Sequence, residues 1–314
     1  MAALTPQQLA GYLQRVGHSQ PSRPCNLHTL AALHTQHLRR IPFENLSLRF
    51  TTGHDSSTEL QSIYSKLVDS PRGGYCFEQN GLFGAALRSL GFEVLDVAAR
   101  VVKPTIDALE MGAHDHHMLL VHLDNRLWLA DVGFGGSSIA LPLLLHDQAE
   151  SYVAPPRDCT AADAYRAEDR PALEGLPLQR MHGYRLRLGV PYALEEPKLA
   201  AASTQPFFAS QVGFYLQRRS TSDAGRWVDQ YFFRLDQFLP DDYELMNRGL
   251  VDNPSSYFNN NLLIALQTEE GRLTIENDHF RQWRDGEAAP HTETRLEGEE
   301  QLKGVLREHF GIEI

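Results

Sequence analysis

Cys76 lies in a segment whose residues suit a nucleophile. Residues 72–80 read RGGYCFEQN, and Gly73 and Gly74 permit a tight turn with positive φ. Apolar residues then recur at helical spacing as far as Leu90, which predicts that Cys76 lies in the first turn of a helix. The free N–H groups and partial positive charge of a helix N-terminus stabilise a thiolate, the nucleophilic form of cysteine. The alternative is a small buried hydrophobe, as most free cysteines are.

A cysteine nucleophile needs a general base, and histidines cluster at His114, His116 and His117. Of these, His117 directly precedes the apolar segment 118–123, and the next strand-like segment, 126–132, contains Asp131. Asp124-Asn125 suits a hairpin turn, so the start of the first strand should face the end of the second. We therefore expect His117 and Asp131 to be neighbours, with the carboxylate fixing the tautomer of the imidazole beside Cys76.

The same residues allow other interpretations. Residues 114–117 also fit a solvated polar loop, and Asp131 alone fits a turn residue before the glycines that follow it. A metal site is a weaker alternative because the ligands are crowded and no second cluster matches them, so we predict no metal. Residues 133–136 form neither a Walker A nor a dinucleotide-binding motif, but the N–H groups of such a glycine-rich loop can bind phosphate.

The elements that must position these residues change in character along the chain. Residues 1–90 are predicted to be helical, with apolar stripes at 9–16 and 27–38 and a helix at 76–90. Alternating and β-branched residues predict strands at 92–102, 118–123, 126–132, 184–188, 227–235 and 271–275. We expect a long surface loop at 146–178, a connector at 189–210, a polar turn region at 286–295 and a terminal amphipathic helix at 299–310.

Composition narrows the class of protein. The 314 residues are 42% hydrophobic and 22% charged, as in an ordinary globular protein, and a net charge of −11 disfavours a nucleic-acid binder. Three separated cysteines without a CxxC pair argue against a disulfide framework and a thiolate zinc site, and Cys25 and Cys159 lack the setting of Cys76. The N-terminal segment does not resemble a signal peptide, and no apolar run is long enough for a membrane span. We therefore expect a cytoplasmic protein.

Four segments together resemble the arylamine N-acetyltransferases: IPFENLSL at 41–48, RGGYCFEQN at 72–80, HHMLLV at 116–121 and ADVGFGG at 130–136. Their order and spacing also fit, and the resemblance extends over nearly the whole chain. It implies an α+β fold with a cysteine-protease-like Cys-His-Asp core. The expected parts are a helical bundle at 1–90 carrying the nucleophile, a β-barrel at 91–205 carrying the histidine and the aspartate, and an α/β lid at 206–314.

The resemblance also implies a reaction. Cys76 would take an acetyl group from acetyl-CoA as a thioester, and an aromatic amine or hydrazine would then accept it, in a ping-pong mechanism. His117 would be the base, since it precedes the apolar strand as the family's histidine does, and Asp131 would orient it. By position, Phe43 and Phe134 match residues that line the acceptor pocket. The CoA-binding segment would be Gly133, Gly135, Gly136 and Ser137 within 133–138.

Two departures leave alternatives open. The 146–178 segment is longer than in compact bacterial members, and variation there is linked to the CoA cleft, so the donor could be propionyl-CoA or malonyl-CoA. The same three catalytic groups would also support a thiol hydrolase or protease, and a catalytically silent binding protein is a third reading. We expect neither a nucleic acid nor a membrane as a partner.

Overall fold

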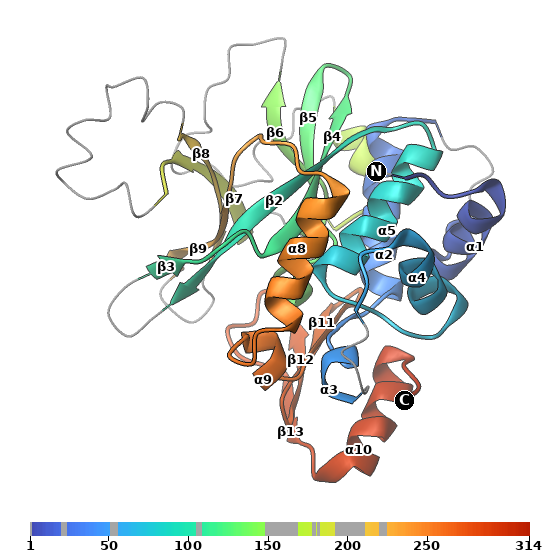
Figure 1. The fold of residues 1–314 in the computed structure, drawn as a ribbon, viewed down its shortest axis with the longest axis vertical. Coiled ribbons are helices and arrows are strands. Elements are labelled where there is room, and N and C mark those ends of the chain that lie inside the picture. Colours follow the sequence, from blue (N-terminus) through green and yellow to red (C-terminus); the bar gives the residue numbers. More distant parts are fainter. Residues whose placement is uncertain are drawn as a thin grey trace.

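Two antiparallel sheets, a group of N-terminal helices and the helices of the C-terminal third form most of the described part of the chain (Figure 1). The structure is a computed structural model. It describes residues 2–19, 24–50, 56–104, 109–147, 169–177, 180, 183–191, 211–219 and 225–314. Within these ranges no helix is both long enough and apolar enough to span a bilayer.

The predicted N-terminal helices are confirmed, and local capping explains their ends. The first begins at Thr5, whose side chain accepts from the Gln8 N–H at 3.3 Å, and ends at Gly17 in the left-handed region, with φ 76°. Asn26 caps the second in the same way, through the Thr29 N–H at 2.9 Å. The helices are α1 (Pro6–Val16), α2 (Leu27–Arg40), α3 (Ser47–Phe50), α4 (Leu60–Tyr64) with a π-helical continuation at Ser65–Asp69, and α5 (Cys76–Ser89).

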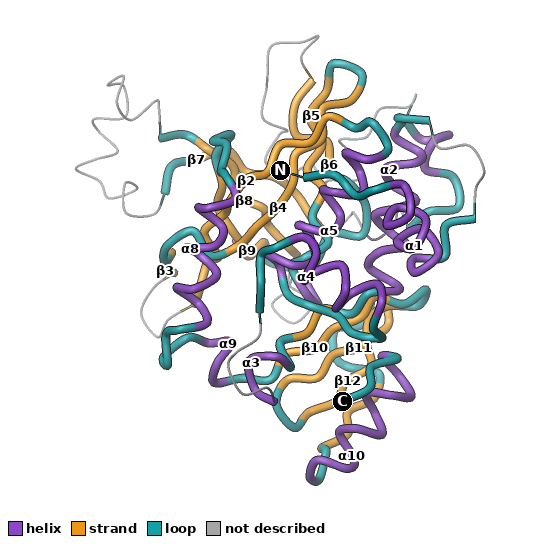
Figure 2. The backbone as a smooth tube through the Cα atoms, turned by 45° about the vertical axis from the view of Figure 1, so that its right-hand side comes forward, coloured by secondary structure: helices purple, strands orange, loops and turns teal. Residues whose placement is uncertain are grey.

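The larger sheet has eight strands in the order β6-β5-β4-β2-β9-β8-β7, with β3 paired to β2 outside this path. It curves into a nearly closed, barrel-like shape (Figure 2). Its strands are β2 (Glu93–Pro104), β3 (Leu109–Met111), β4 (His116–Leu123), β5 (Arg126–Ala130), β6 (Leu143–Asp147), β7 (Tyr184–Gly189), β8 (Gly213–Arg219) and β9 (Trp227–Phe233).

The hairpin between β4 and β5 is confirmed. Asp124 and Asn125 have φ of 51° and 57°, the left-handed values that a two-residue hairpin turn requires, and Leu123 pairs with Arg126. The strand β4 starts at His116, two residues earlier than predicted, so His116 and His117 belong to the sheet. Both are buried, which excludes the solvated loop as their setting.

The smaller sheet joins distant parts of the chain. Its strand order is β1-β10-β11-β12-β13. Strand β1 comes from the N-terminal third of the chain and pairs with β10, with Phe43 opposite Ala265. Helices α8 (Pro240–Val251) and α9 (Tyr257–Asn260) precede β10 in the chain, and α10 (Gly298–Val305) with a π-helical end at Leu306–Phe310 follows β13. The strands are β1 (Phe43–Glu44), β10 (Leu263–Gln267), β11 (Gly271–Glu276), β12 (His279–Arg284) and β13 (Thr292–Arg295).

Two sequence expectations need correction. The predicted polar turn region at 286–295 ends in β13, an edge strand whose four residues are all exposed, so no apolar alternation could announce it. The predicted surface loop at 146–178 is not wholly superficial, because Asp169 and Leu173 are buried. Both Asp169 carboxylate oxygens accept from Arg126, at 2.8 and 2.9 Å. Residues 148–168 and 178, including Cys159, lie outside the described residues, as do 192–210 of the predicted connector.

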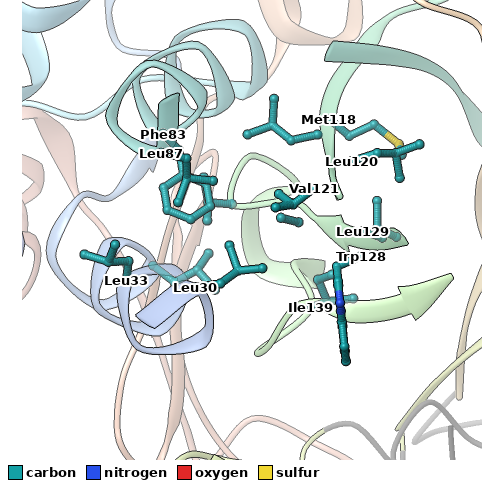
Figure 3. Close-up of a cluster of buried hydrophobic side chains, with 14 of the residues drawn as sticks. Leu30, Leu33, Phe83, Leu87, Met118, Leu120, Val121, Trp128, Leu129 and Ile139 are labelled. Carbon is teal, nitrogen blue, oxygen red and sulfur yellow. The ribbon is translucent and has the colours of Figure 1, made fainter. Parts of the chain in front are cut away.

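The proposed division at 90 and 205 remains a prediction. Strands β8 and β9 follow the second boundary, yet they belong to the larger sheet, where Phe233 of β9 pairs with Ala99 of β2. The main core lies between this sheet and the helices. Figure 3 shows Leu30 and Leu33 of α2 and Phe83 and Leu87 of α5 facing side chains of β4 and β5, among them Val121. This packing holds α5 against β4.

Candidate active site

Cys76 is the first residue of α5 and is buried, with 3% of its surface exposed. Tyr75 before it is extended, and its N–H donates to the Glu78 carboxylate at 3.1 Å, which satisfies one group at the helix start. Lys66 pairs with the same carboxylate at 2.7 Å. The sequence therefore predicts the start of this helix correctly, and the thiol lies where helix N–H groups are free.

The role of the two glycines differs from the prediction. Neither Gly73 nor Gly74 has a positive φ. They are needed for space instead: a Cβ on Gly73 would collide with the carbonyl oxygen of Pro42, and one on Gly74 would stand 2.5 Å from a carboxylate oxygen of Glu78. The chain thus passes close to 42–44, where Glu44 N–H donates to the Gly74 carbonyl at 3.0 Å.

His116 is the histidine that links Cys76 to Asp131. Its Nε2 lies 2.8 Å from Asp131 Oδ2, and the ring lies close enough to Cys76 for the thiol to raise the pKa of the imidazole. Because Nε2 is occupied by the carboxylate, Nδ1 is the ring nitrogen left for sulfur. The thiol contacts the carbonyl oxygen of Asp115 at 3.9 Å. All three groups are buried.

His117, which the sequence analysis expected in this position, faces the other way. Its Nε2 lies 3.0 Å from Asp96 Oδ1, and its ring centroid lies 4.2 Å from that of Tyr243 on α8. Adjacent residues of a strand point to opposite faces, so only one of the two histidines can meet Asp131. The register decides which: the pairs Leu123–Arg126 and Leu119–Ala130 place residue 131 beyond the end of β5, on the face of residues 118 and 116.

Four donors surround the Asp131 carboxylate. Asn80 Nδ2 and the Gly133 N–H donate to Oδ1, both at 2.9 Å, while Tyr231 donates to Oδ2 at 3.1 Å beside the His116 contact. Burial raises the pKa of this carboxyl, but the charge of His116 and these hydrogen bonds outweigh burial and lower it below its ordinary value. The group is therefore held as a carboxylate.

The same contacts act on the imidazole. Burial alone would lower the pKa of His116, but the Asp131 carboxylate and then the Cys76 thiol more than offset burial and raise it to about 10. A histidine with this pKa readily holds a proton taken from sulfur. The site is therefore arranged to keep His116 protonated beside Cys76.

Sequence reasoning missed Asn80 and Tyr231. Asn80 lies one helical turn after Cys76, a spacing that places both on one face of α5 and was therefore available as a signal. Besides Asp131, it donates to the His117 carbonyl at 2.6 Å and accepts from the Val132 N–H at 3.0 Å, so it ties α5 to both strands. Tyr231 comes from β9, and nothing local in the sequence connects it to the site.

The sulfur opens onto a cavity of about 850 Å³ between the two sheets. Every residue predicted to bind substrate or CoA lines it: Phe43, Phe134, Gly133, Gly135, Gly136 and Ser137. The Phe134 ring stands edge-on to the His116 ring, with 5.0 Å between centroids. The structure thus brings these residues together around Cys76, and what they bind remains a prediction.

Gly133 is the point where the loop after β5 touches the nucleophile's helix. A Cβ there would stand 2.8 Å from the Cα of Cys76 and 2.6 Å from Asn80 Nδ2. Any larger residue would push α5 away from the loop. The geometry as a whole belongs to enzymes that use a buried, base-assisted thiol.

Comparisons with known proteins give the family. A family model described as N-acetyltransferase matches residues 26–168 and 183–314. The chain is 32% identical over 289 residues to an arylamine N-acetyltransferase of Escherichia coli (strain K12), covering 91% of this chain and 83% of the relative. It is also 32% identical over 310 residues to one of Mycolicibacterium smegmatis, covering 98% and 92%.

The solved structures agree. The arylamine N-acetyltransferase from Salmonella typhimurium matches with a TM-score of 0.72 at 27% identity, covering 98% of this chain and 92% of that one. The chain belongs to the arylamine N-acetyltransferase family and is an acyl-transferring enzyme.

Proposed function

We propose that the protein transfers an acetyl group from acetyl-CoA to the nitrogen of an aromatic amine or hydrazine, through an acetyl thioester on Cys76. The observation that carries the proposal is the position of His116, which lies 2.8 Å from Asp131 and lines the same cavity as Cys76, close enough for the thiol to raise its pKa. The names of the relatives support acetyl transfer to arylamines.

In the first half-reaction, the Cys76 thiolate attacks the thioester carbonyl and His116 holds the proton that left sulfur. The tetrahedral intermediate then expels the thiolate of CoA, which takes this proton, and Cys76 is left acetylated. Asp131 stays ionised throughout and keeps the imidazole in the orientation that serves sulfur. Its low pKa supports this role.

In the second half-reaction, the amine nitrogen attacks the carbonyl of acetyl-Cys76. His116 accepts the proton that the nitrogen loses, and collapse of the intermediate breaks the C–S bond and releases the amide and the free thiolate. One histidine serves both steps because each step moves one proton to or from the same place beside sulfur. Phe43 and Phe134, which line the cavity, are the aromatic walls we assign to the acceptor.

The proposal is tested by mass spectrometry of the protein after mixing with acetyl-CoA in the absence of amine. One acetyl group should appear on Cys76 and disappear when an arylamine is added. Cys76→Ala should neither acquire the adduct nor turn over. Unimpaired turnover by Cys76→Ala would contradict the proposal.

Two measurements separate this function from its alternatives. A thiol hydrolase would release CoA at the same rate with and without amine, whereas the proposed enzyme releases CoA quickly only when an acceptor is present. A matrix of acetyl-CoA, propionyl-CoA and malonyl-CoA against several arylamines identifies the donor. We expect acetyl-CoA to give the highest kcat/KM.

A further inference from the structure

Two arginines from different sheets meet on the wall of the cavity that contains Cys76. Arg218 is on β8 of the larger sheet, and Arg272 is on β11 of the smaller one. Both are half-buried. They come together only because the two sheets face one another across the cavity.

Neither guanidinium is at salt-bridge distance from a carboxylate within the residues that the structure describes. Arg218 Nη1 donates to the Ser137 hydroxyl at 3.0 Å. Arg272 lies over the ring of Trp283, 4.4 Å from its centroid. A hydroxyl and an aromatic face orient these groups but bring no carboxylate into direct contact with their positive charges.

The other cations of the same wall are compensated. Lys103 pairs with Asp115 at 2.9 Å, and Arg281 pairs with Glu293 at 2.9 Å. Arg180, which lies close enough to influence Arg272, forms an ion pair with Asp285. Arg218 and Arg272 therefore differ from these neighbouring basic residues in having no ion pair with a described carboxylate.

Holding these two charges together has an energetic cost. Burial, and then the neighbouring charge of Arg218, lower the pKa of Arg272 to about 10, although Tyr184 and Asp285 act in the opposite direction. Like charges in a partly desolvated wall repel each other more strongly than in water. An anion placed between them would relieve this repulsion.

A short loop connects the arginines to the nucleophile. Gly133 at its start abuts Cys76, whereas Ser137 at its end bonds Arg218, and a Cβ on Gly136 would stand 3.7 Å from Arg272 Cδ. Four residue steps span at most roughly 14 Å of extended chain. The arginines therefore lie near enough to Cys76 for one molecule to contact both. Its reacting carbonyl would lie at Cys76, and an anionic group at its other end would lie at the arginines.

We propose that Arg218 and Arg272 form an anion subsite that holds a phosphate group of the acyl-CoA donor. The inference rests on the proposed function. Guanidinium groups bind phosphate oxygens through paired, charge-assisted hydrogen bonds, and two neighbouring guanidinium groups suit a doubly charged group. A carboxylate on an acidic acceptor has the same chemistry, so the experiment must separate the two sources.

The test compares the acetylation of Cys76 by acetyl-CoA with its acetylation by S-acetylpantetheine, which carries the same thioester without phosphates. Arg218→Gln and Arg272→Gln should each lower the second-order rate constant for acetyl-CoA by about tenfold or more, the worth of a charge-assisted hydrogen bond. Both should leave the rate with S-acetylpantetheine within about twofold of the unmodified protein. Arg284→Gln, on β12 and outside the cavity wall, is the matched control and should affect neither donor.

Each other outcome overturns the subsite. Equal losses of the acetylation rate with both donors would mean that the arginines support the fold. An unchanged rate with acetyl-CoA would mean that they do not bind a phosphate of the donor. A loss confined to the second half-reaction, seen with aminobenzoate but not with aniline, would assign the anion to the acceptor. Failure of the proposed function looks different, because Cys76 of the unmodified protein would then be acetylated by neither donor.

Discussion

His116 Nε2 and Asp131 Oδ2 lie 2.8 Å apart, joined across the open end of the β4–β5 hairpin. The hairpin register places both side chains on one face of the sheet. The adjacent histidine forms a separate pair with Asp96 on the opposite face. One strand therefore carries two buried histidine–aspartate pairs, of which only one touches the cysteine.

The two histidines should separate in function. Replacing His116 by Gln removes the proton acceptor beside sulfur and should lower the rate of Cys76 acetylation by about 10²–10⁴-fold. Replacing His117 by Gln should change this rate by less than about tenfold, because its side chain does not face the cavity. Stopped-flow measurement of CoA release on both variants checks the assignment. The reverse order of effects would restore His117 as the base.

Asn80 should matter more for stability than its neutral side chain suggests. Asn80→Ala removes the partner that the Asn80 side chain gives to the Val132 N–H and to the His117 carbonyl, and it removes one of the two donors to Asp131 Oδ1. We expect a loss of about 3 kcal/mol in the free energy of unfolding, since each unsatisfied buried group costs ~1–3 kcal/mol. Urea unfolding measures it, and Gln8→Ala, at an exposed cap of α1, is the comparison. A loss no larger than that of Gln8→Ala would show that the network is dispensable.

Gly133 and Gly249 should respond oppositely to alanine. A methyl group at Gly133 would stand within 2.8 Å of Cys76 Cα, so Gly133→Ala should destabilise the fold by about 1–3 kcal/mol and slow acetylation. Gly249 lies in α8 with nothing near its Cβ position, so Gly249→Ala should stabilise the helix by up to ~1 kcal/mol. Thermal unfolding of the two variants decides the matter. Equal melting temperatures would contradict the close approach at Gly133.

The pH dependence of stability should reveal the raised pKa of His116. Since its pKa of about 10 in the folded protein exceeds the ordinary value, its contribution is complete below ~6.5. That contribution is lost as pH rises toward 10, at a slope of at most about 1.4 kcal/mol per pH unit. Asp131, whose pKa is lowered, adds stability above ~4 that is lost on acidification.

His116→Gln should flatten the alkaline decline between pH 7 and 10, whereas His117→Gln should leave more of it in place. Urea unfolding across this range provides the measurement. A decline of the same slope in the unmodified protein and in His116→Gln would place the titrating group elsewhere.

Local patterns predicted the longer helices α1, α2 and α5, the C-terminal helix and six of the strands, together with the start of α5 at Cys76, but they did not predict β6, β8, β10, β12 or α8. The choice between His116 and His117 depended on register, which the sequence does contain: counting back from the turn at Asp124-Asn125 sets residue 131 opposite residue 118. His116 is two residues before 118 and therefore lies on the same face of the strand. Position next to the apolar run was the weaker guide, because both histidines turned out to lie within the strand.

Other parts of the site depend on contacts that no local pattern reveals. Tyr231 reaches Asp131 from a strand 100 residues away, and Arg218 and Arg272 meet only when two sheets face each other. Their identity as site residues follows from tertiary packing. The edge strand β13 could not be predicted for a different reason: all of its residues are exposed, so the sequence there has no alternation of apolar and polar residues.

The pairing of Phe43 with Ala265 has a consequence for the order in which the protein is made. The nucleophile's helix and its His–Asp partners are synthesised early, but the strands β10–β12 that wall the cavity emerge from the ribosome near the end. Until then β1 lacks its partner strand β10, and the cavity beside the thiol lacks the wall that β10–β12 provide. A nascent chain that ends before β10 therefore contains Cys76, His116 and Asp131 but lacks the strands that complete the cavity around them.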